Sequence, residues 1–249
     1  MKNFFTVLGG MGTEATESYV RLLNKRTPAE KDQDYLDYIV VNHATIPDRT
    51  AYIIDHNEPN FFPYLLEDVK QQSSLNPNFM AIACNTAHYF YEDLQAATSV
   101  PILHMPRLAI KELVRKYPDE KRIGLIATAG TLADGVYDHE IKRVGGELIT
   151  GDEHLQSMVM RLIYGCIKER GIVNAELYHE ILQIMHDKYE CNVIVLGCTE
   201  LSLAQEKAPN HSYNVIDAQS VLVDKSIELA QAFRNNKENA QSLVKEMLK

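Results

Sequence analysis

The chain has 249 residues, of which 45% are apolar and 24% are charged, and its formal net charge is −9 at neutral pH. This length and composition suffice for the core of one large or two small α/β domains. The acidic balance argues against nucleic-acid binding, and no apolar run approaches the roughly 20 residues of a membrane span. We therefore expect a protein that acts on a small molecule.

The beginning of the chain is predicted to be a core strand and not a secretory signal. Residues 4–8 are mostly apolar, but Gly9 and Gly10 follow too soon for the apolar region of a signal peptide. The cysteines show no CxxC pair and no disulfide framework, which is typical of reduced thiols. They are Cys84, Cys166, Cys191 and Cys198. These features predict a cytoplasmic location.

Apolar runs and helical patterns alternate along the chain. Strands are predicted at 4–8, 37–42, 79–84, 100–104, 123–128, 147–150, 193–198 and 213–217. Helices are predicted at 14–26, 61–74, 86–97, 106–117, 132–144, 153–170, 175–190 and 219–235. This alternation is typical of parallel sheets covered by helices on both faces, so the predicted fold class is α/β with doubly wound sheets.

One local design occurs twice, 114 positions apart. Residues 79–84 and 193–198 are apolar runs that end in Cys84 and Cys198, and a polar turn follows each cysteine. Such a run is typical of a buried parallel strand. The side chains able to cap a following helix are Asn85, Thr86 and Thr199. Because a helix N-terminus favours thiolate, we expect both thiols to have a pKa below the ordinary value.

A second pair of segments, residues 6–13 and 123–131, supports an internal duplication, although strand-to-glycine turns can also match by chance. The duplication predicts two similar subdomains related by pseudo-twofold symmetry. The first comprises residues 1–103 plus about 211–249, and the second comprises residues 104–210. Ligands of such sheets bind beyond the carboxyl ends of the strands. Four loops would then meet in one cleft, at 9–13, 84–88, 128–131 and 198–202.

Four segments in this order resemble the signature motifs of the aspartate/glutamate racemase family. They are Gly-Gly-Met-Gly from residue 9 with Ala-Thr from residue 15, Ile-Pro-Asp-Arg-Thr from residue 46, Ala-Cys-Asn-Thr-Ala-His from residue 83 and Leu-Gly-Cys-Thr-Glu-Leu from residue 196. The resemblance covers nearly the whole chain. Thr13 stands where the family usually has proline. One branch of the family has threonine at the first catalytic position, whereas Cys84 at that position resembles the two-cysteine members.

The resemblance implies an isomerase that racemises aspartate, glutamate or both without pyridoxal phosphate or any other cofactor. One cysteine thiolate takes the α-proton while the other cysteine, as thiol, protonates the opposite face. Inversion at carbon requires two such groups. By family analogy Cys198 serves the L-enantiomer and Cys84 the D-enantiomer. Family members also commonly form homodimers, and the apolar residues that suit such a contact as well as the core are Ile53, Ile54, Phe61 and Phe62.

The substrate is expected to meet hydrogen-bond donors and cations in this cleft. Donors are needed where carbanion charge develops, and a guanidinium offers two parallel hydrogen bonds to a carboxylate. The predicted substrate-binding residues are Met11, Arg49, Asn85, Thr86, Thr128, Lys168, Thr199 and Glu200. Of these, the resemblance implies Met11 and Lys168. The segment around Lys168 has one residue more than family examples, and Arg170 is a competing cation.

Other interpretations have weaker support. Cys84 and His88 are spaced as zinc ligands, but no second pair accompanies them, so no metal site is predicted. Residues 10–15 match the dinucleotide-binding pattern G-x-G-x-x-A, with Asp32 or Asp34 as the ribose ligand, yet this leaves both cysteine motifs unexplained. Hydantoin racemases, maleate isomerases, arylmalonate decarboxylases and a non-catalytic amino-acid sensor are further alternatives. The residues open between packing, thiol orientation and substrate contact are His43, His104, His139 and Glu200.

Overall fold

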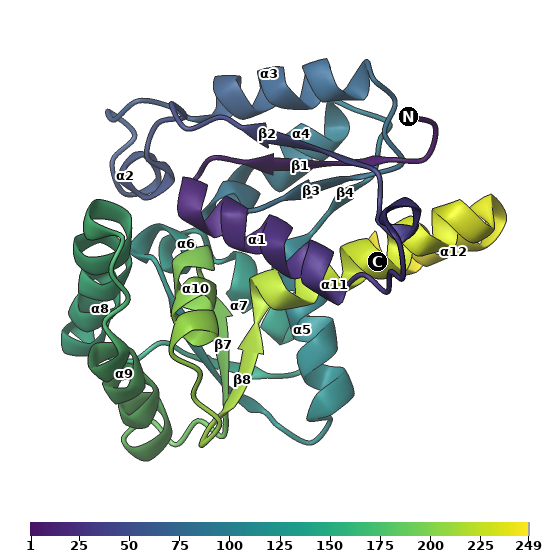
Figure 1. Ribbon diagram of the computed structural model, residues 1–249. Coiled ribbons are helices and arrows are strands. Elements are labelled where there is room, and N and C mark those ends of the chain that lie inside the picture. The colour runs from purple at the N-terminus through teal and green to yellow at the C-terminus, as the bar shows by residue number, and fades with distance from the viewer. Residues whose placement is uncertain (249) are drawn as a thin grey trace.

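The computed structural model describes residues 1–248, without the side chain of residue 237. It contains two four-stranded sheets, in which every pairing of strands is parallel (Figure 1). The strand order is β2-β1-β3-β4 in the first sheet and β6-β5-β7-β8 in the second. The two sheets therefore have the same topology, which confirms the predicted α/β fold of two similar parallel units.

Every predicted strand overlaps an observed one. The first sheet contains β1 (Phe5–Gly9), β2 (Tyr38–Asn42), β3 (Met80–Ile82) and β4 (Ile102–Leu103). The second sheet contains β5 (Arg122–Ala127), β6 (Glu147–Ile149), β7 (Val193–Gly197) and β8 (Asn214–Asp217). All residues of β1, β3 and β7 are buried. Helices cover both faces of such central strands, so their sequences are largely continuous apolar runs instead of alternating ones.

The helices of the first unit are α1 (Thr13–Arg26), α2 (Arg49–Ile54), α3 (Phe62–Ser73) and α4 (Tyr91–Ala96), with the 3-10 helices η1 (Asp32–Asp34) and η2 (Thr86–Phe90). The later helices are α5 (Met105–Lys116), α6 (Ala129–Asp134), α7 (Val136–Arg143), α8 (Glu153–Met160), the π-helix η3 (Arg161–Lys168), α9 (Ala175–Asp187), α10 (Thr199–Lys207), α11 (Ala218–Asn235) and α12 (Lys237–Leu248). The helix predicted over 132–144 is divided at Gly135, whose φ of +70° is left-handed.

The last strand differs from the predicted domain boundary. Residues from about 211 were predicted to belong to the first subdomain, but β8 pairs with β7, so residues 214–217 complete the second sheet. After β8, α11 packs against both α1 and α5, and the Tyr19 hydroxyl of α1 donates to Ser226 of α11. The chain therefore returns to the first unit only with α11, after β8 and not before it as predicted.

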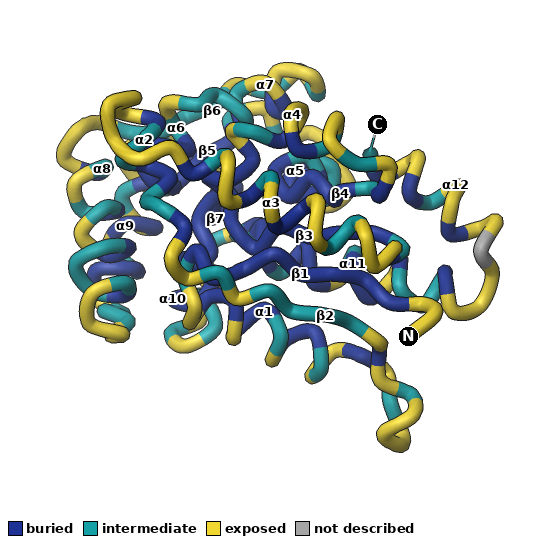
Figure 2. The backbone as a smooth tube through the Cα atoms, turned by 90° about the horizontal axis from the view of Figure 1, so that it is seen from above, coloured by how far each residue is buried: buried dark blue, intermediate teal, exposed yellow. Residues whose placement is uncertain are grey.

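Apolar side chains form three buried clusters. The largest includes Phe5, Tyr19, Leu108, Val195 and Leu222 and so contains residues from both sheets, while the other two cover the outer face of each sheet. Figure 2 shows the central strands as continuous buried segments beneath partly exposed helices. Full burial of one such aliphatic or aromatic side chain contributes about 1.5–3 kcal/mol. This shared core holds the carboxyl ends of both sheets in a fixed relation.

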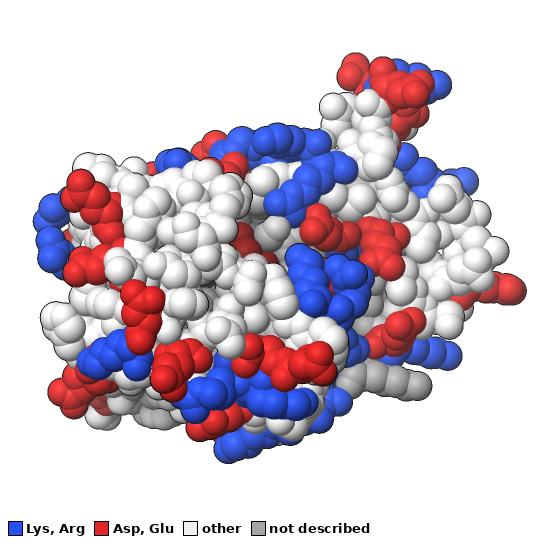
Figure 3. All heavy atoms as spheres, turned by 90° about the horizontal axis from the view of Figure 1, so that it is seen from below, with Lys and Arg blue, Asp and Glu red and all other residues white. Residues whose placement is uncertain are grey.

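Acidic and basic side chains are interspersed on the surface. The face in Figure 3 shows neighbouring clusters of both signs and no extended basic area. None of the described helices combines the length and apolar character required to cross a membrane.

Candidate active site

Two buried cysteines follow corresponding strands of the two sheets. Cys84 comes two residues after β3, and Cys198 comes directly after β7 and is the N-cap residue of α10. Both thiols are free, and each residue is only 5% exposed. Because β3 and β7 occupy the third position of their sheets, the structure places the two cysteines equivalently in the two units.

The environment of Cys198 corrects one expectation. Burial and the neighbouring Glu200 carboxylate raise the pKa of the Cys198 thiol well above its ordinary value, although the Lys168 ammonium opposes them. The helix N-terminus was expected to lower this pKa, but its effect is smaller than that of burial next to a negative charge. Cys84 precedes the short 3-10 helix η2 and not an α-helix.

Glu200 connects Cys198 to Lys168. The Cys198 Sγ donates a hydrogen bond to Glu200 Oε2 at 2.9 Å, and Lys168 Nζ lies 3.1 Å from Glu200 Oε1. The Thr199 hydroxyl also donates to Glu200 Oε2, at 3.3 Å. Lys168 stands at the end of η3, and its pKa is raised because the charges of Glu200 and the thiols outweigh the lowering effect of burial.

Arg49 is held by main-chain carbonyls. Its NH1 nitrogen donates to the carbonyls of Ile46 and Pro47 at 3.2 and 3.0 Å, and NH2 donates to the Met11 carbonyl at 2.8 Å. The side chain is buried, and its Nε has no hydrogen-bond partner among the described residues. Three of the five guanidinium donors are thus used, which leaves Nε–H and one further N–H for a ligand.

A cavity of 320 Å³ brings several predicted residues together. Its lining residues are Gly10, Met11, Gly12, Thr13, Glu14, Ala15, Ala44, Arg49, Ile167, Lys168 and Glu200. The predicted contacts Met11, Arg49, Lys168 and Glu200 therefore share one space. Cys198 does not line the cavity, but it contacts Glu200, which does. Arg170, the competing cation, does not line this cavity but another one, on the other side of η3.

The remaining predicted residues, Asn85, Thr86, Thr128 and Thr199, are not among those that line this cavity. Three of them join the two units. Thr86 of the first unit is hydrogen-bonded through its hydroxyl to those of Thr128 and Thr131 of the second, at 3.1 and 2.8 Å. Asn85 Oδ1 accepts a hydrogen bond from the Tyr137 hydroxyl at 2.6 Å, and its Nδ2 has no partner among the described residues. An unpaired buried amide donor is costly unless a ligand or water meets it.

His88 supports the first cysteine loop. The Met105 N–H donates to His88 Nε2 at 3.0 Å, so the proton is on Nδ1, which donates to the Cys84 carbonyl at 2.9 Å. Burial lowers the pKa of His88 to about 4, so the ring is neutral at pH 7. No cluster of three His, Cys, Asp or Glu side chains suited to a metal ion occurs within residues 1–248. His88 is therefore a positioning group for the loop that carries Cys84.

A hydrogen bond joins η3 of the second unit to the start of α2 in the first. The Tyr164 hydroxyl of η3 donates to Asp48, with distances of 3.0 and 3.2 Å to its two carboxylate oxygens. Asp48 also caps α2 by accepting from the Ala51 N–H at 2.8 Å. On α6, a Cβ at Gly130 would lie 2.8 Å from the Thr50 Cα, so only glycine permits this approach of α2. Thr131 lies in the cleft loop predicted at 128–131, whereas Tyr137 and Tyr164 were not predicted, because their partners come from the other unit.

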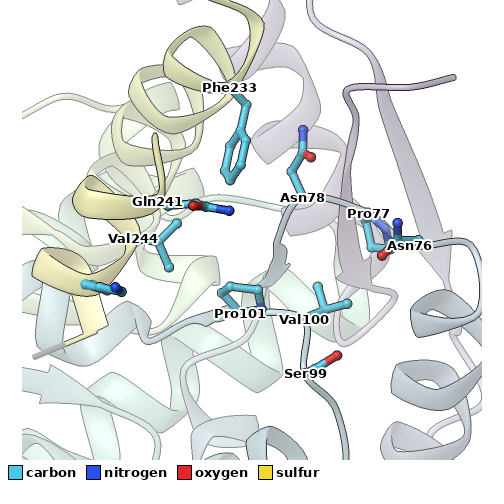
Figure 4. Close-up of a pocket in the computed structure, with 10 residues that line it drawn as sticks. Asn76, Pro77, Asn78, Ser99, Val100, Pro101, Phe233, Gln241 and Val244 are labelled. Atoms are coloured by element: carbon cyan, nitrogen blue, oxygen red, sulfur yellow. The ribbon is translucent and has the colours of Figure 1, made fainter. Parts of the chain in front are cut away.

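A larger cavity of 560 Å³ lies elsewhere (Figure 4). Asn78 and Pro101 in its wall precede β3 and β4, and Phe233, Gln241 and Val244 come from α11 and α12. It therefore lies at the amino ends of the strands, whereas the cysteines lie at the carboxyl ends. None of the predicted site residues is among the described residues that line it.

Comparison with known proteins shows which family the chain resembles. The family model for Asp/Glu/hydantoin racemases matches residues 8–225. The chain is 26% identical over 238 residues to the broad specificity amino-acid racemase RacX of Bacillus subtilis, covering 92% of this chain and 99% of that protein. It is also similar to the aspartate racemase of Picrophilus torridus, with a TM-score of 0.77 and 25% identity over 92% of this chain and 94% of that one.

A further neighbour shows how widely the fold is shared. The glutamate racemase of Francisella tularensis, solved with D-glutamate, has a TM-score of 0.64 at 20% identity and covers 94% of this chain and 82% of that one. These matches confirm the resemblance drawn from the sequence motifs and the interpretation of the chain as an isomerase. The chain belongs to the Asp/Glu/hydantoin racemase family.

Proposed function

We propose that the protein racemises an acidic amino acid, aspartate or glutamate or both, without a cofactor, by two-base proton transfer between Cys84 and Cys198. The observation that carries this proposal is the equivalent placement of the two buried thiols, each after the third strand of its sheet, with Glu200 linking Cys198 to Lys168. Two acid/base groups on opposite sides of one carbon are what stereochemical inversion requires.

The residues around the thiols supply the other requirements of the reaction. The unpaired Nδ2 of Asn85 is a donor for the carboxylate next to the developing carbanion. In the cavity, the open Nε edge of Arg49 and the ammonium of Lys168 would hold the side-chain carboxylate of the substrate. The buried positions of these donors exclude water and strengthen each contact.

A wider substrate range is the second candidate. Glu14 also lines the cavity, and a carboxylate in the wall favours neutral or basic side chains over acidic ones. The match to a broad specificity amino-acid racemase points in the same direction. Racemisation of lysine or alanine as fast as that of aspartate would establish this candidate and remove the preference for acidic substrates.

The location and assembly follow from the same chemistry. Catalytic thiols must stay reduced, and all four cysteines are free, so we place the enzyme in the cytoplasm. The exposed Ile54, next to half-buried Tyr52 and Phe62, offers an apolar contact for a homodimer. Sedimentation of the parent protein measures that assembly.

The proposal is tested by proton NMR in D2O with each enantiomer of aspartate, glutamate, alanine and lysine. We expect the α-proton signal of both enantiomers of an acidic amino acid to disappear while optical rotation decays to zero. Retention of the α-proton in every amino acid would refute racemisation. Activity after dialysis against a chelator is the control for the absence of a metal requirement.

A further inference from the structure

Glu200 is a buried carboxylate whose two oxygens have different partners. Oε2 accepts the hydrogen bond from Cys198 Sγ at 2.9 Å, and Oε1 lies 3.1 Å from Lys168 Nζ. The residue is 3% exposed. Gly12 leaves room for it, since a Cβ at position 12 would lie 2.9 Å from Oε1. The fold thus holds one carboxylate between a thiol and an ammonium.

The two cysteines differ in this respect. A thiol that donates to a carboxylate keeps its proton, because its loss would place two negative charges side by side. Glu200 contacts the Cys198 sulfur, whereas no side chain within residues 1–248 is hydrogen-bonded to the Cys84 sulfur. The site is therefore asymmetric although the strands that carry the cysteines are equivalent.

We propose that Glu200 fixes the resting state of the enzyme by holding Cys198 as the thiol, which leaves Cys84 as the base. This inference rests on the two-cysteine racemisation proposed above. Glu200 acts through Cys198 and is a positioning residue, not the direct substrate contact expected from the sequence. The resting enzyme is then ready for the enantiomer whose α-proton Cys84 takes.

The proton balance defines what happens in one turnover. The Cys84 thiolate takes the α-proton, and the carbanion takes the proton of Cys198 from the opposite face. Product then leaves an enzyme with Cys84 protonated and Cys198 as a thiolate beside Glu200. Resetting moves one proton from Cys84 to Cys198 through solvent, with no net gain or loss. This step is favourable because it removes the two adjacent negative charges.

The groups that face Glu200 come from every surrounding element. Lys168 of η3 is in contact with it, Arg49 of α2 and Glu14 of α1 line the same cavity, and Cys198 and Thr199 are the N-cap and first residue of its own helix, α10. Lys168 Nζ pairs with the Glu200 carboxylate at 3.1 Å. A substrate carboxylate bound to Lys168 would weaken that ion pair, so the negative charge of Glu200 would act on Cys198 most strongly in the loaded site.

Kinetics of the two directions provide the first readout. At equilibrium the enantiomers are equal in amount, so kcat/KM must be equal for both. If one protonation state of the free enzyme is favoured, kcat and KM are both larger for one enantiomer than for the other. The ratio between the enantiomers is then the same for kcat and for KM, and we call this ratio the common factor. In Glu200→Gln we expect that factor to fall at least about tenfold, the effect of a shift of one unit in the pKa of a thiol.

The second readout needs no substrate. The rate of alkylation of Cys198, followed by peptide mass spectrometry across pH, gives the midpoint of its titration. We expect the midpoint to fall by about one pH unit or more in Glu200→Gln and by less in Glu200→Asp, which keeps the charge. Gly12→Ala, which displaces Oε1, should lower it as well. Glu206→Gln is the matched control, because Glu206 lies on the same helix but pairs with Arg21 outside the cavity.

The outcomes separate this inference from the proposed function. Active Cys84→Ala or Cys198→Ala enzymes would refute the two-cysteine mechanism itself. Suppose instead that these variants are inactive, and that Glu200→Gln has the same common factor and the same Cys198 titration midpoint as the control Glu206→Gln. Only the role of Glu200 is then overturned. Should Glu200→Gln fail to fold, an unshifted midpoint in both Glu200→Asp and Gly12→Ala overturns it equally.

Discussion

Arg49→Leu removes a guanidinium that three main-chain carbonyls surround. The carbonyls of Ile46, Pro47 and Met11 each accept from it, and at 8% exposure water can replace these donors only in part. A hydrogen bond to a charged group contributes about 1.5–3 kcal/mol, and partial hydration recovers some of the sum. We therefore expect the free energy of unfolding to fall by about 2–4 kcal/mol and Tm by roughly 5–15 °C.

The same substitution should reduce activity on acidic substrates. Loss of a charge-assisted contact to the substrate carboxylate lowers kcat/KM for aspartate or glutamate by about 10- to 150-fold, and Arg49→Lys should recover only part of it. Calorimetry and racemisation assays measure the two effects. Arg21→Leu is the control, because exposed ion pairs such as Arg21 with Glu206 contribute at most about 1 kcal/mol. An Arg49→Leu enzyme with the parent Tm and kcat/KM would refute this account of Arg49.

Three further predictions concern other parts of the site. Tyr164→Phe removes the hydroxyl that binds Asp48, so KM should rise several-fold while the fold persists, as steady-state kinetics can measure. Because the folded pKa of His88 is lowered to about 4 from 6.5, its neutral form stabilises the fold above pH 6.5, and that stability is lost as pH falls from 6.5 towards 4. His88 alone should contribute a loss of about 2 kcal/mol between pH 7 and pH 5 in denaturant unfolding, and His88→Phe should remove that part. Finally, thiol alkylation should abolish activity and bound substrate should slow it; full activity with Cys84 and Cys198 both alkylated would contradict the mechanism.

The strands could be predicted because burial on both faces leaves a simple record in the sequence. The apolar run predicted as a strand is 193–198, and the observed β7, Val193–Gly197, ends one residue earlier. The position of Cys198 after that strand followed directly. In contrast, α2 has six residues, too few to show a helical period. The apolar pattern of a strand also does not indicate which sheet the strand joins. Residues 214–217 were therefore predicted in the first unit, whereas β8 pairs with β7 in the second.

The side-chain partners could not be predicted because they depend on how the two units meet. Nothing local indicates that Glu200 contacts both Cys198 and Lys168, so the raised pKa of Cys198 was missed. The extra residue noticed near Lys168 has a structural counterpart, since residues 161–168 form a π-helix, whose wider turn accommodates one more residue. That turn brings Lys168 into the cavity in place of Arg170.

The most direct test of the central claim is α-proton exchange in D2O by Cys84→Ala and Cys198→Ala. Each variant retains one base on one face of the substrate, so each should exchange the α-proton of a single enantiomer without inverting it. The two variants should act on opposite enantiomers, and both should lose racemisation by at least about 10²-fold. Racemisation near the parent rate by either variant, or exchange of the same enantiomer by both, would contradict a mechanism in which Cys84 and Cys198 work from opposite sides.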